Sequence, residues 1–204
     1  ALRENMTKEE FIKEVTNGLV APPQYFPKNV GMNKSVNKAY EAILSDGNTP
    51  LSLEDFEQLV ADPQVLIMDV RHEEDFVQGF IKGAIFFGLD GSFAPWVGTI
   101  IEDLNTPIVL ICPEGREQET ITRLSRVGYD NVKGYLKGGY ESWKAAHKAT
   151  DQIESISSQD FVENHYSKSI EILDVRKEAE FISEHIEHES VVNLPLAEVM
   201  ENHK

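Results

Sequence analysis

The sequence predicts an α/β fold, with a central parallel sheet that is flanked by helices on both faces. Short apolar runs alternate with helical patterns between residues 45 and 148. Two of these runs, Val65–Val70 and Ile108–Ile111, are almost purely apolar, which is typical of strands buried on both faces. A third observation is a repeat: Leu51–Phe76 returns as Ile156–Phe181 at a constant offset of 105 residues. A repeat of this length indicates a duplicated folding unit, and we expect a partial second copy to follow the complete first one.

The expected elements follow one another regularly along the chain. Before residue 50 we expect a helix opened by the capping box Thr7–Glu10 and stopped at Gly18, and a helical run at Ala39–Leu44. Strands are then expected at Val65–Val70, Ala84–Phe87, Ile108–Ile111 and Asn131–Leu136. The helices expected around them are Ser52–Val60, Ala94–Leu104, one through Ile121, Leu124 and Val127, and one from Gly138 through Trp143. Ala21-Pro22-Pro23 breaks the chain, and Tyr25 and Phe26 are expected to anchor onto a neighbouring surface.

Four further expectations concern the connections and the second copy. We expect Ser45–Asn48 to form a linker or turn, and His147–Ile153 to separate the two copies. In the second copy, Ser157 is predicted to cap a helix as Ser52 does in the first. A strand is expected at Val191–Leu194.

Charge and composition exclude several classes of function. The net charge is −16, and the segments contribute unequally: residues 1–44 carry +1 and residues 45–204 carry −17. An acidic surface argues against nucleic acid and against anionic membranes as partners. The opening residues are too polar for a signal peptide, and a lone cysteine excludes an internal disulfide. We therefore expect a cytoplasmic protein. From the two ends of the sequence we also expect the chain to be part of a longer protein.

Cys112 is the candidate for chemistry. It ends the strand PIVLIC and precedes the loop Pro113–Glu117, with a helix expected behind the loop. In parallel α/β sheets reactive groups sit at the carboxyl ends of strands, where loop amides and a helix dipole can hold a thiolate. A cysteine placed there can take up sulfur as a persulfide and pass it on.

The order of motifs resembles the rhodanese family. The matching pieces are LSLEDFEQLV, VLIMDVR, GFIKGAI, PIVLICPEG and VGYDNVKGYLKGGYESWK. The resemblance covers about 45–147 in full and 154–204 as an amino-terminal half. It implies a rhodanese-like sheet and sulfur transfer through a Cys112 persulfide. It further implies loop or anion-binding roles for Gly115, Arg116, Glu117 and Gln118, and a loop-bracing role for Asp69 and Arg71.

The loop departs from the pattern of active rhodanese-like proteins. Pro113 lacks a backbone donor, and Glu117 stands where an arginine is usual, while Arg116 sits one residue early. Carboxylates near a thiol raise its pKa, whereas Arg116 and the helix terminus oppose this effect. We expect a degenerate first copy that serves as a spacer or docking domain. The alternative is an active sulfurtransferase, so the question of enzymatic activity stays open here.

Residues 1–44 resemble the carboxyl-terminal tail of a metallo-β-lactamase-fold protein that carries fused rhodanese domains. This implies three parts: the tail at 1–44, a first rhodanese-like domain at 45–148, and the amino-terminal half of a second at 152–204. The implied parent is a fusion of the persulfide dioxygenase-like type, or a related metallo-hydrolase. Its implied partners are the lactamase-like domain, the remainder of the second rhodanese domain, and small thiols or persulfides. No cofactor is expected in this chain.

Two other patterns are weaker indications of function: a possible metal site and phosphatase chemistry. His185 and His188 have helical i,i+3 spacing, but two histidines without further ligands are a weak metal signal, and we expect no metal site. Phosphatase chemistry on a related fold would need an anion clamp that Glu117 replaces.

Overall fold

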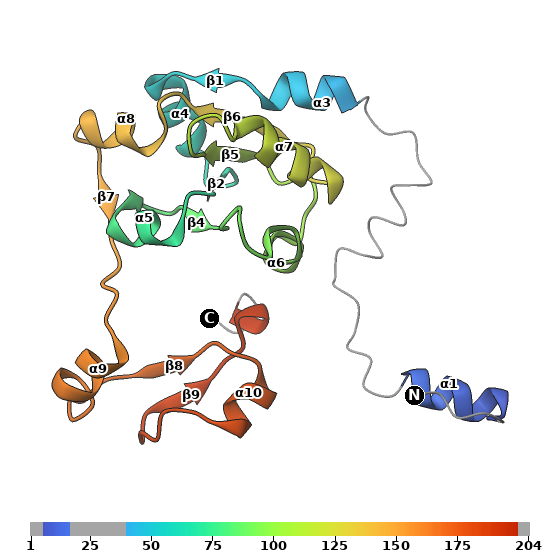
Figure 1. The fold of residues 1–204 in the computed structure, drawn as a ribbon. Helices are drawn as coiled ribbons and strands as arrows, with labels where there is room; N and C mark the ends of the chain where they lie inside the picture. Colours follow the sequence, from blue (N-terminus) through green and yellow to red (C-terminus); the bar gives the residue numbers. More distant parts are fainter. Residues whose placement is uncertain (1–5, 17–39, 200–204) are drawn as a thin grey trace.

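The computed structural model of this chain describes residues 6–16 and 40–199 (Figure 1). The predictions for Gly18, for Ala21-Pro22-Pro23 and for the anchors Tyr25 and Phe26 lie outside the described residues.

The first described element confirms its predicted capping box. Helix α1 spans Lys8–Thr16. The Thr7 hydroxyl accepts from the Glu10 amide at 3.2 Å, and the Thr7 amide donates to the Glu10 carboxylate at 2.9 Å. These reciprocal bonds satisfy amide groups that have no partner within the helix.

A five-stranded parallel sheet forms the centre of the fold. Its strands are β1 (Pro50–Leu51), β2 (Leu66–Asp69), β4 (Ile85–Phe86), β5 (Ile108–Ile111) and β6 (Val132–Leu136), in the spatial order β1-β6-β5-β2-β4. The register pairs Leu66 with Ile108 and Asp69 with Ile111. All four residues of β5 are buried, as the continuous apolar run predicted. The expected parallel sheet is confirmed.

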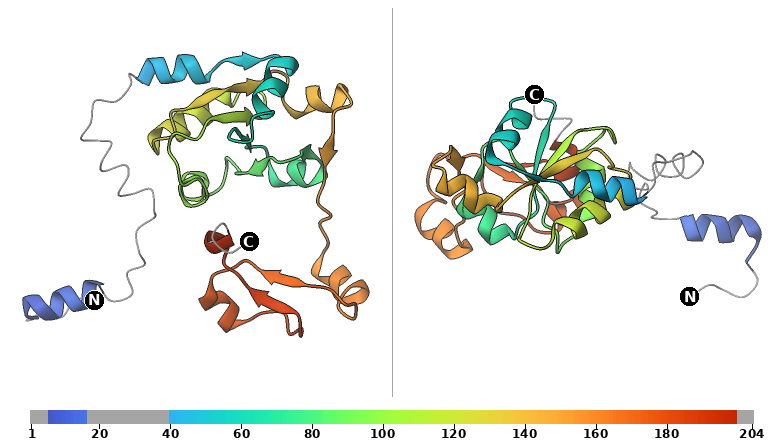
Figure 2. Two further views of the ribbon diagram at one scale, coloured as in Figure 1. Left: turned by 180° about the vertical axis from the view of Figure 1, so that it is seen from behind. Right: turned by 90° about the horizontal axis from the view of Figure 1, so that it is seen from above.

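Helices cover both faces of this sheet (Figure 2). One face packs against α6 (Phe93–Ile100) and α7 (Glu117–Arg126), which contribute Val97, Ile121 and Leu124 to the larger apolar core. The other face packs against α4 (Leu53–Val60) and α8 (Gly139–Ala145), where Phe56 meets Trp143 edge to face. The Ser52 side chain accepts from the Asp55 amide at 3.1 Å, which confirms the predicted cap of α4.

Several boundaries differ from the sequence prediction. Helix α3 spans Tyr40–Gly47, so the linker predicted at Ser45–Asn48 is wrong. A Cβ at position 47 would lie 3.1 Å from Ile121 and 3.3 Å from Val132, so Gly47 allows a close approach of the helix end rather than a turn. Helix α6 ends at Ile100, four residues before the predicted Leu104.

Some short elements were not predicted at all. Helix α5 spans Glu73–Gln78, and β3 (Phe80–Ile81) pairs antiparallel with β7 (Thr150–Asp151). The segment predicted as a linker, His147–Ile153, therefore contains a strand that is paired with the first unit. Two-residue strands carry too few side chains to show a periodic pattern.

Residues 157–199 form a smaller set of elements. These are α9 (Ser158–Asn164), β8 (Ile172–Asp174), α10 (Glu178–Ser183), β9 (Val191–Asn193) and a 3-10 turn, η1 (Leu196–Glu198). Strands β8 and β9 pair in parallel, and Ser157 caps α9 as predicted. That this region is the first half of a second rhodanese-like copy stays a prediction.

No helix among residues 6–16 and 40–199 is both long enough and apolar enough to cross a membrane.

Candidate functional site

Cys112 follows β5 directly, at the carboxyl edge of the sheet, as the sequence predicted. The loop behind it is tight, because the Arg116 amide donates to the Pro113 carbonyl at 3.1 Å. Gly115 has a φ of 82°, a conformation that side chains disfavour, so glycine is needed at this turn. The chain then enters α7 at Glu117.

The Cys112 side chain is buried, with 7% of its surface exposed. Its thiol donates to the Thr120 hydroxyl at an S···O distance of 3.7 Å. The hydroxyl proton of Thr120 is not available to the sulfur, because that hydroxyl donates to the Arg116 carbonyl at 2.9 Å. A thiolate would gain from a hydroxyl that donates to sulfur. In this arrangement Thr120 accepts instead, which suits the neutral thiol.

Burial raises the pKa of the Cys112 thiol to about 12, well above its usual range. The charges of Glu117 and Asp69 add to this rise, and the positive charge of Arg116 opposes it. The sequence predicted the role of carboxylates, and Glu117 takes part as expected. The larger cause is loss of solvent around the sulfur, which the loop sequence alone does not reveal. At neutral pH the thiol is therefore protonated.

A pocket of about 590 Å³ reaches Cys112. It combines three basic side chains, Arg71, Lys137 and Lys144, with four acidic ones, Asp75, Glu114, Glu117 and Glu141. The remaining lining residues are Gln78, Gly79, Pro113, Tyr135, Gly138, Gly139 and Tyr140. The pocket thus brings together three of the predicted site residues, namely Cys112, Glu117 and Arg71.

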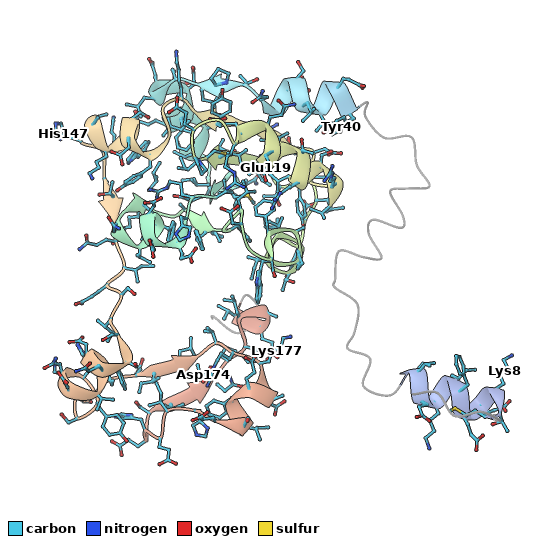
Figure 3. The ribbon with its side chains drawn as sticks, in the orientation of Figure 1. Lys8, Tyr40, Glu119, His147, Asp174 and Lys177 are labelled. Atoms are coloured by element: carbon cyan, nitrogen blue, oxygen red, sulfur yellow. The ribbon has the colours of Figure 1, made fainter. Side chains whose placement is uncertain are left out.

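Gly115, Arg116 and Gln118 do not line this pocket. Arg116 makes two hydrogen bonds of 2.8 Å to the two carboxylate oxygens of Asp90, and its Nε donates to Glu119 at 2.8 Å. Glu119, labelled in Figure 3, also pairs with Arg123. The Arg116 guanidinium holds the pKa of both carboxyls, Asp90 and Glu119, below their usual range. Because these two acids already engage Arg116, it is poorly placed for the predicted anion-binding role.

Asp69 and Arg71 form a bidentate pair at the end of β2. The Arg71 Nη2 lies 2.7 Å from an Asp69 oxygen, and Asp69 is fully buried. Arg71 also donates to the Gly79 carbonyl at 2.8 Å and lies over the Tyr140 ring, 4.2 Å from its centroid. In the described part of the chain these contacts hold residue 79 and helix α8. The predicted role of this pair in bracing the loop after Cys112 stays a prediction.

Sequence reasoning missed Thr120, Tyr140, Lys137 and Lys144. Thr120 was detectable in principle, since it precedes Ile121 and lies four residues before Leu124 on the buried stripe of α7. A polar residue on such a stripe needs a partner. Tyr140 and Lys144 lie on α8 and Lys137 follows β6, and these segments reach the pocket only through the spatial order of the strands.

The helical spacing predicted for His185 and His188 is wrong, because both residues follow the end of α10. His185 stacks on Phe181, with centroids 4.1 Å apart, and His188 contacts the Ser190 hydroxyl at 2.7 Å. The described residues contain no group of three or more potential metal ligands.

Residues 52–146 match the family described as "Rhodanese-like domain". This part of the chain is a rhodanese-like domain. Its boundaries agree with the run of motifs from the Ser52 cap to the helix that carries Trp143. No curated protein sequence gives a significant match to the chain.

The chain is similar to several solved structures. A metallo-beta-lactamase from Staphylococcus aureus subsp. aureus COL is 21% identical with a TM-score of 0.51, over 65% of this chain and 36% of its own. A thiosulfate sulfurtransferase from Pseudomonas aeruginosa is 17% identical with a TM-score of 0.45, over 76% and 36%. A Rhodanese_3-like domain of the Alr3790 protein from Anabaena sp. is 21% identical with a TM-score of 0.41, over 46% and 98%. The chain thus spans about a third of the first two proteins. The likeness to the Staphylococcus aureus structure concerns the fold alone.

Proposed function

We propose that the rhodanese-like domain is a non-catalytic copy that serves as a spacer or docking module in a sulfur-handling protein. The observation that carries this proposal is the state of Cys112: the thiol is buried, donates a hydrogen bond to Thr120, and has a pKa raised far above neutral pH. Sulfur transfer requires a thiolate that attacks a donor. A thiol held in this state attacks slowly.

The charges around the sulfur support the same proposal. Glu117 lines the pocket where an anionic sulfur donor would have to approach, and Glu114 lies beside it. Arg116, the cation of the loop, is paired with Asp90 and Glu119. An anionic donor would therefore meet carboxylates at the sulfur, because the basic side chains that line the pocket lie outside the loop: Arg71 follows β2, Lys137 follows β6 and Lys144 lies on α8.

We further propose the setting of this module. Residues 1–44 would be the tail of a metallo-β-lactamase-like domain, and residues 152–204 would begin a second rhodanese-like domain in a cytoplasmic, persulfide dioxygenase-like parent. The named partners would be these two domains and small thiols or persulfides. In support, the solved structure of a metallo-beta-lactamase contains a region with this fold, and the Asp-Val-Arg motif of residues 69–71 recurs 105 residues later.

An active sulfurtransferase is the second candidate, and one observation favours it. The pocket of about 590 Å³ is not filled by side chains, and it opens onto Cys112.

Mass spectrometry after exposure to thiosulfate or to a small persulfide separates the two candidates. We expect no sulfur adduct on Cys112 in the native chain, with a Cys112→Ala variant as the blank. Alkylation of Cys112 in urea checks that the thiol was free to react. A stoichiometric gain of one sulfur atom on native Cys112 would establish the sulfurtransferase instead.

A further inference from the structure

The pocket beside Cys112 holds a buried hydroxyl group that the rest of the described chain leaves unused. Tyr140 lines the pocket and is only 8% exposed, yet its hydroxyl makes no hydrogen bond within residues 6–16 and 40–199. A side chain at position 79 would overlap this hydroxyl, so Gly79 leaves the space in which it stands. Because a buried tyrosine hydroxyl usually has a partner, this free donor points to a ligand in the pocket.

Arg71 adds further donors next to the Tyr140 hydroxyl. Its Nε and Nη2 donate to Asp69, and Nη2 also donates to the Gly79 carbonyl. Its Nη1 makes no hydrogen bond within the described part of the chain, although the arginine side chain is only 11% exposed. The guanidinium lies 4.2 Å from the centroid of the Tyr140 ring. Two N–H groups and one O–H group in a positively charged setting suit a carboxylate.

A free negative charge lies in the same pocket. Glu117 is half-buried, and among the described residues its carboxylate has no ion pair and no hydrogen bond. It stands at the start of α7, which covers one face of the sheet, whereas Tyr140 belongs to α8 on the other face (Figure 2). The carboxylate and the donors therefore reach the pocket from different sides. A half-buried carboxylate without a partner is stabilised by a cation.

The rim of the pocket favours neither sign of charge. Its exposed charged residues are Asp75, Glu114, Lys137, Glu141 and Lys144, so that three negative charges stand against two positive ones. The inner groups therefore decide what binds. A simple anion that meets Arg71 also meets Glu117, and a simple cation that meets Glu117 also meets Arg71. A ligand that carries both charges satisfies both groups.

From this we infer that the pocket binds a zwitterion of the size of a short peptide. The ligand carboxylate accepts hydrogen bonds from the Tyr140 hydroxyl and from Nη1 of Arg71, and the ligand ammonium group donates to Glu117. A volume of about 590 Å³ is within the range of pockets that enclose small ligands. This binding role goes beyond the spacer or docking role proposed above, and Cys112 forms no bond with the ligand in it.

Triglycine is a suitable probe, because it has an ammonium group and a carboxylate but no thiol. The readout is an NMR titration of the full chain that follows the backbone amides of Gly79, Glu117 and Tyr140. N-acetyl-triglycine lacks the positive charge, and triglycinamide lacks the negative one. We expect triglycine to bind about 10-fold or more tightly than either analogue, since each loses one set of charge-assisted hydrogen bonds.

Two conservative variants assign the two ends of the ligand. Tyr140→Phe removes a hydroxyl that makes no bond within the described chain, so the fold is kept. It should weaken triglycine binding by about 3- to 10-fold and leave triglycinamide unchanged. Glu117→Gln should weaken triglycine by a similar factor without weakening N-acetyl-triglycine. The matched control is Glu114→Gln at the exposed rim, for which we expect a change within about twofold.

Three results would overturn the inference. The first is the absence of amide shifts at the pocket up to about 20 mM triglycine, a concentration that would reveal even a weak site. The second is equal binding of N-acetyl-triglycine, which would make this an anion site, and the third is equal binding of triglycinamide, which would make it a cation site. Sulfur loading of Cys112 is measured separately, so the proposed function and triglycine binding can fail independently.

Discussion

At the scale of single residues, the chemistry of this domain depends on the environment of one sulfur atom. Cys112 sits where the sequence placed it, at the end of a buried strand and before a helix. Its reactivity is set by contacts from outside the loop motif: Thr120 accepts a hydrogen bond from the thiol, and the surrounding core excludes water. The position of Cys112 was therefore predictable from the sequence, whereas the protonation state of its thiol depends on packing.

The charge of Glu117 gives a test at this scale. Glu117→Gln removes a carboxylate that raises the pKa of Cys112, so we expect the alkylation rate of the native thiol at pH 8 to rise roughly 3- to 10-fold. Glu117→Arg should raise it further. The matched control is Glu114→Gln, which alters the same pocket without removing a group that acts on the Cys112 pKa. Equal rates in all four proteins would show that Glu117 has no electrostatic effect on the sulfur.

At the scale of elements, the caps and buried strands followed directly from residue patterns. Ser52 and Ser157 cap helices because their hydroxyls accept from amides three residues later. The end of α3 was missed because Gly47 looked like a turn, while its lack of a side chain serves close packing against Ile121 and Val132. A single sequence does not distinguish these two uses of glycine.

The twin Asp-Arg pairs predict different costs of mutation. Arg71→Ala leaves the fully buried Asp69 carboxylate without its partner, and we expect a loss of about 3–5 kcal/mol in the free energy of unfolding. Arg176→Ala breaks the equivalent pair with Asp174, in which the arginine is exposed to solvent, and we expect about 1 kcal/mol or less. Hydrogen exchange at β2 and at β8 measures the two effects separately. Similar losses at both sites would show that burial is not what distinguishes the two pairs.

At the scale of the whole molecule, the domain keeps the rhodanese-like framework while its sulfur site is held in a neutral state. The parallel sheet, its two helical layers and the pocket at its carboxyl edge are all present. The sequence predicted this architecture because buried parallel strands have a strong apolar signature. Arg71 after β2, Lys137 after β6 and Lys144 on α8 converge on the pocket, and this could be known only once the strand order was known.

The raised pKa of Cys112 makes the stability of the domain depend on pH. The native thiol keeps its proton up to a pKa of about 12, whereas an unfolded cysteine ionises near pH 9. Between these values the unfolded state binds fewer protons, so stability should fall as pH rises, and this part of the fall should vanish in Cys112→Ala.

The most direct test of the central claim is the pH dependence of iodoacetamide alkylation at Cys112 in the native chain. We expect a very slow rate at neutral pH, no inflection below about pH 10, and fast labelling once urea unfolds the domain. A native thiolate that titrates below pH 7 would contradict the account and identify Cys112 as an activated nucleophile.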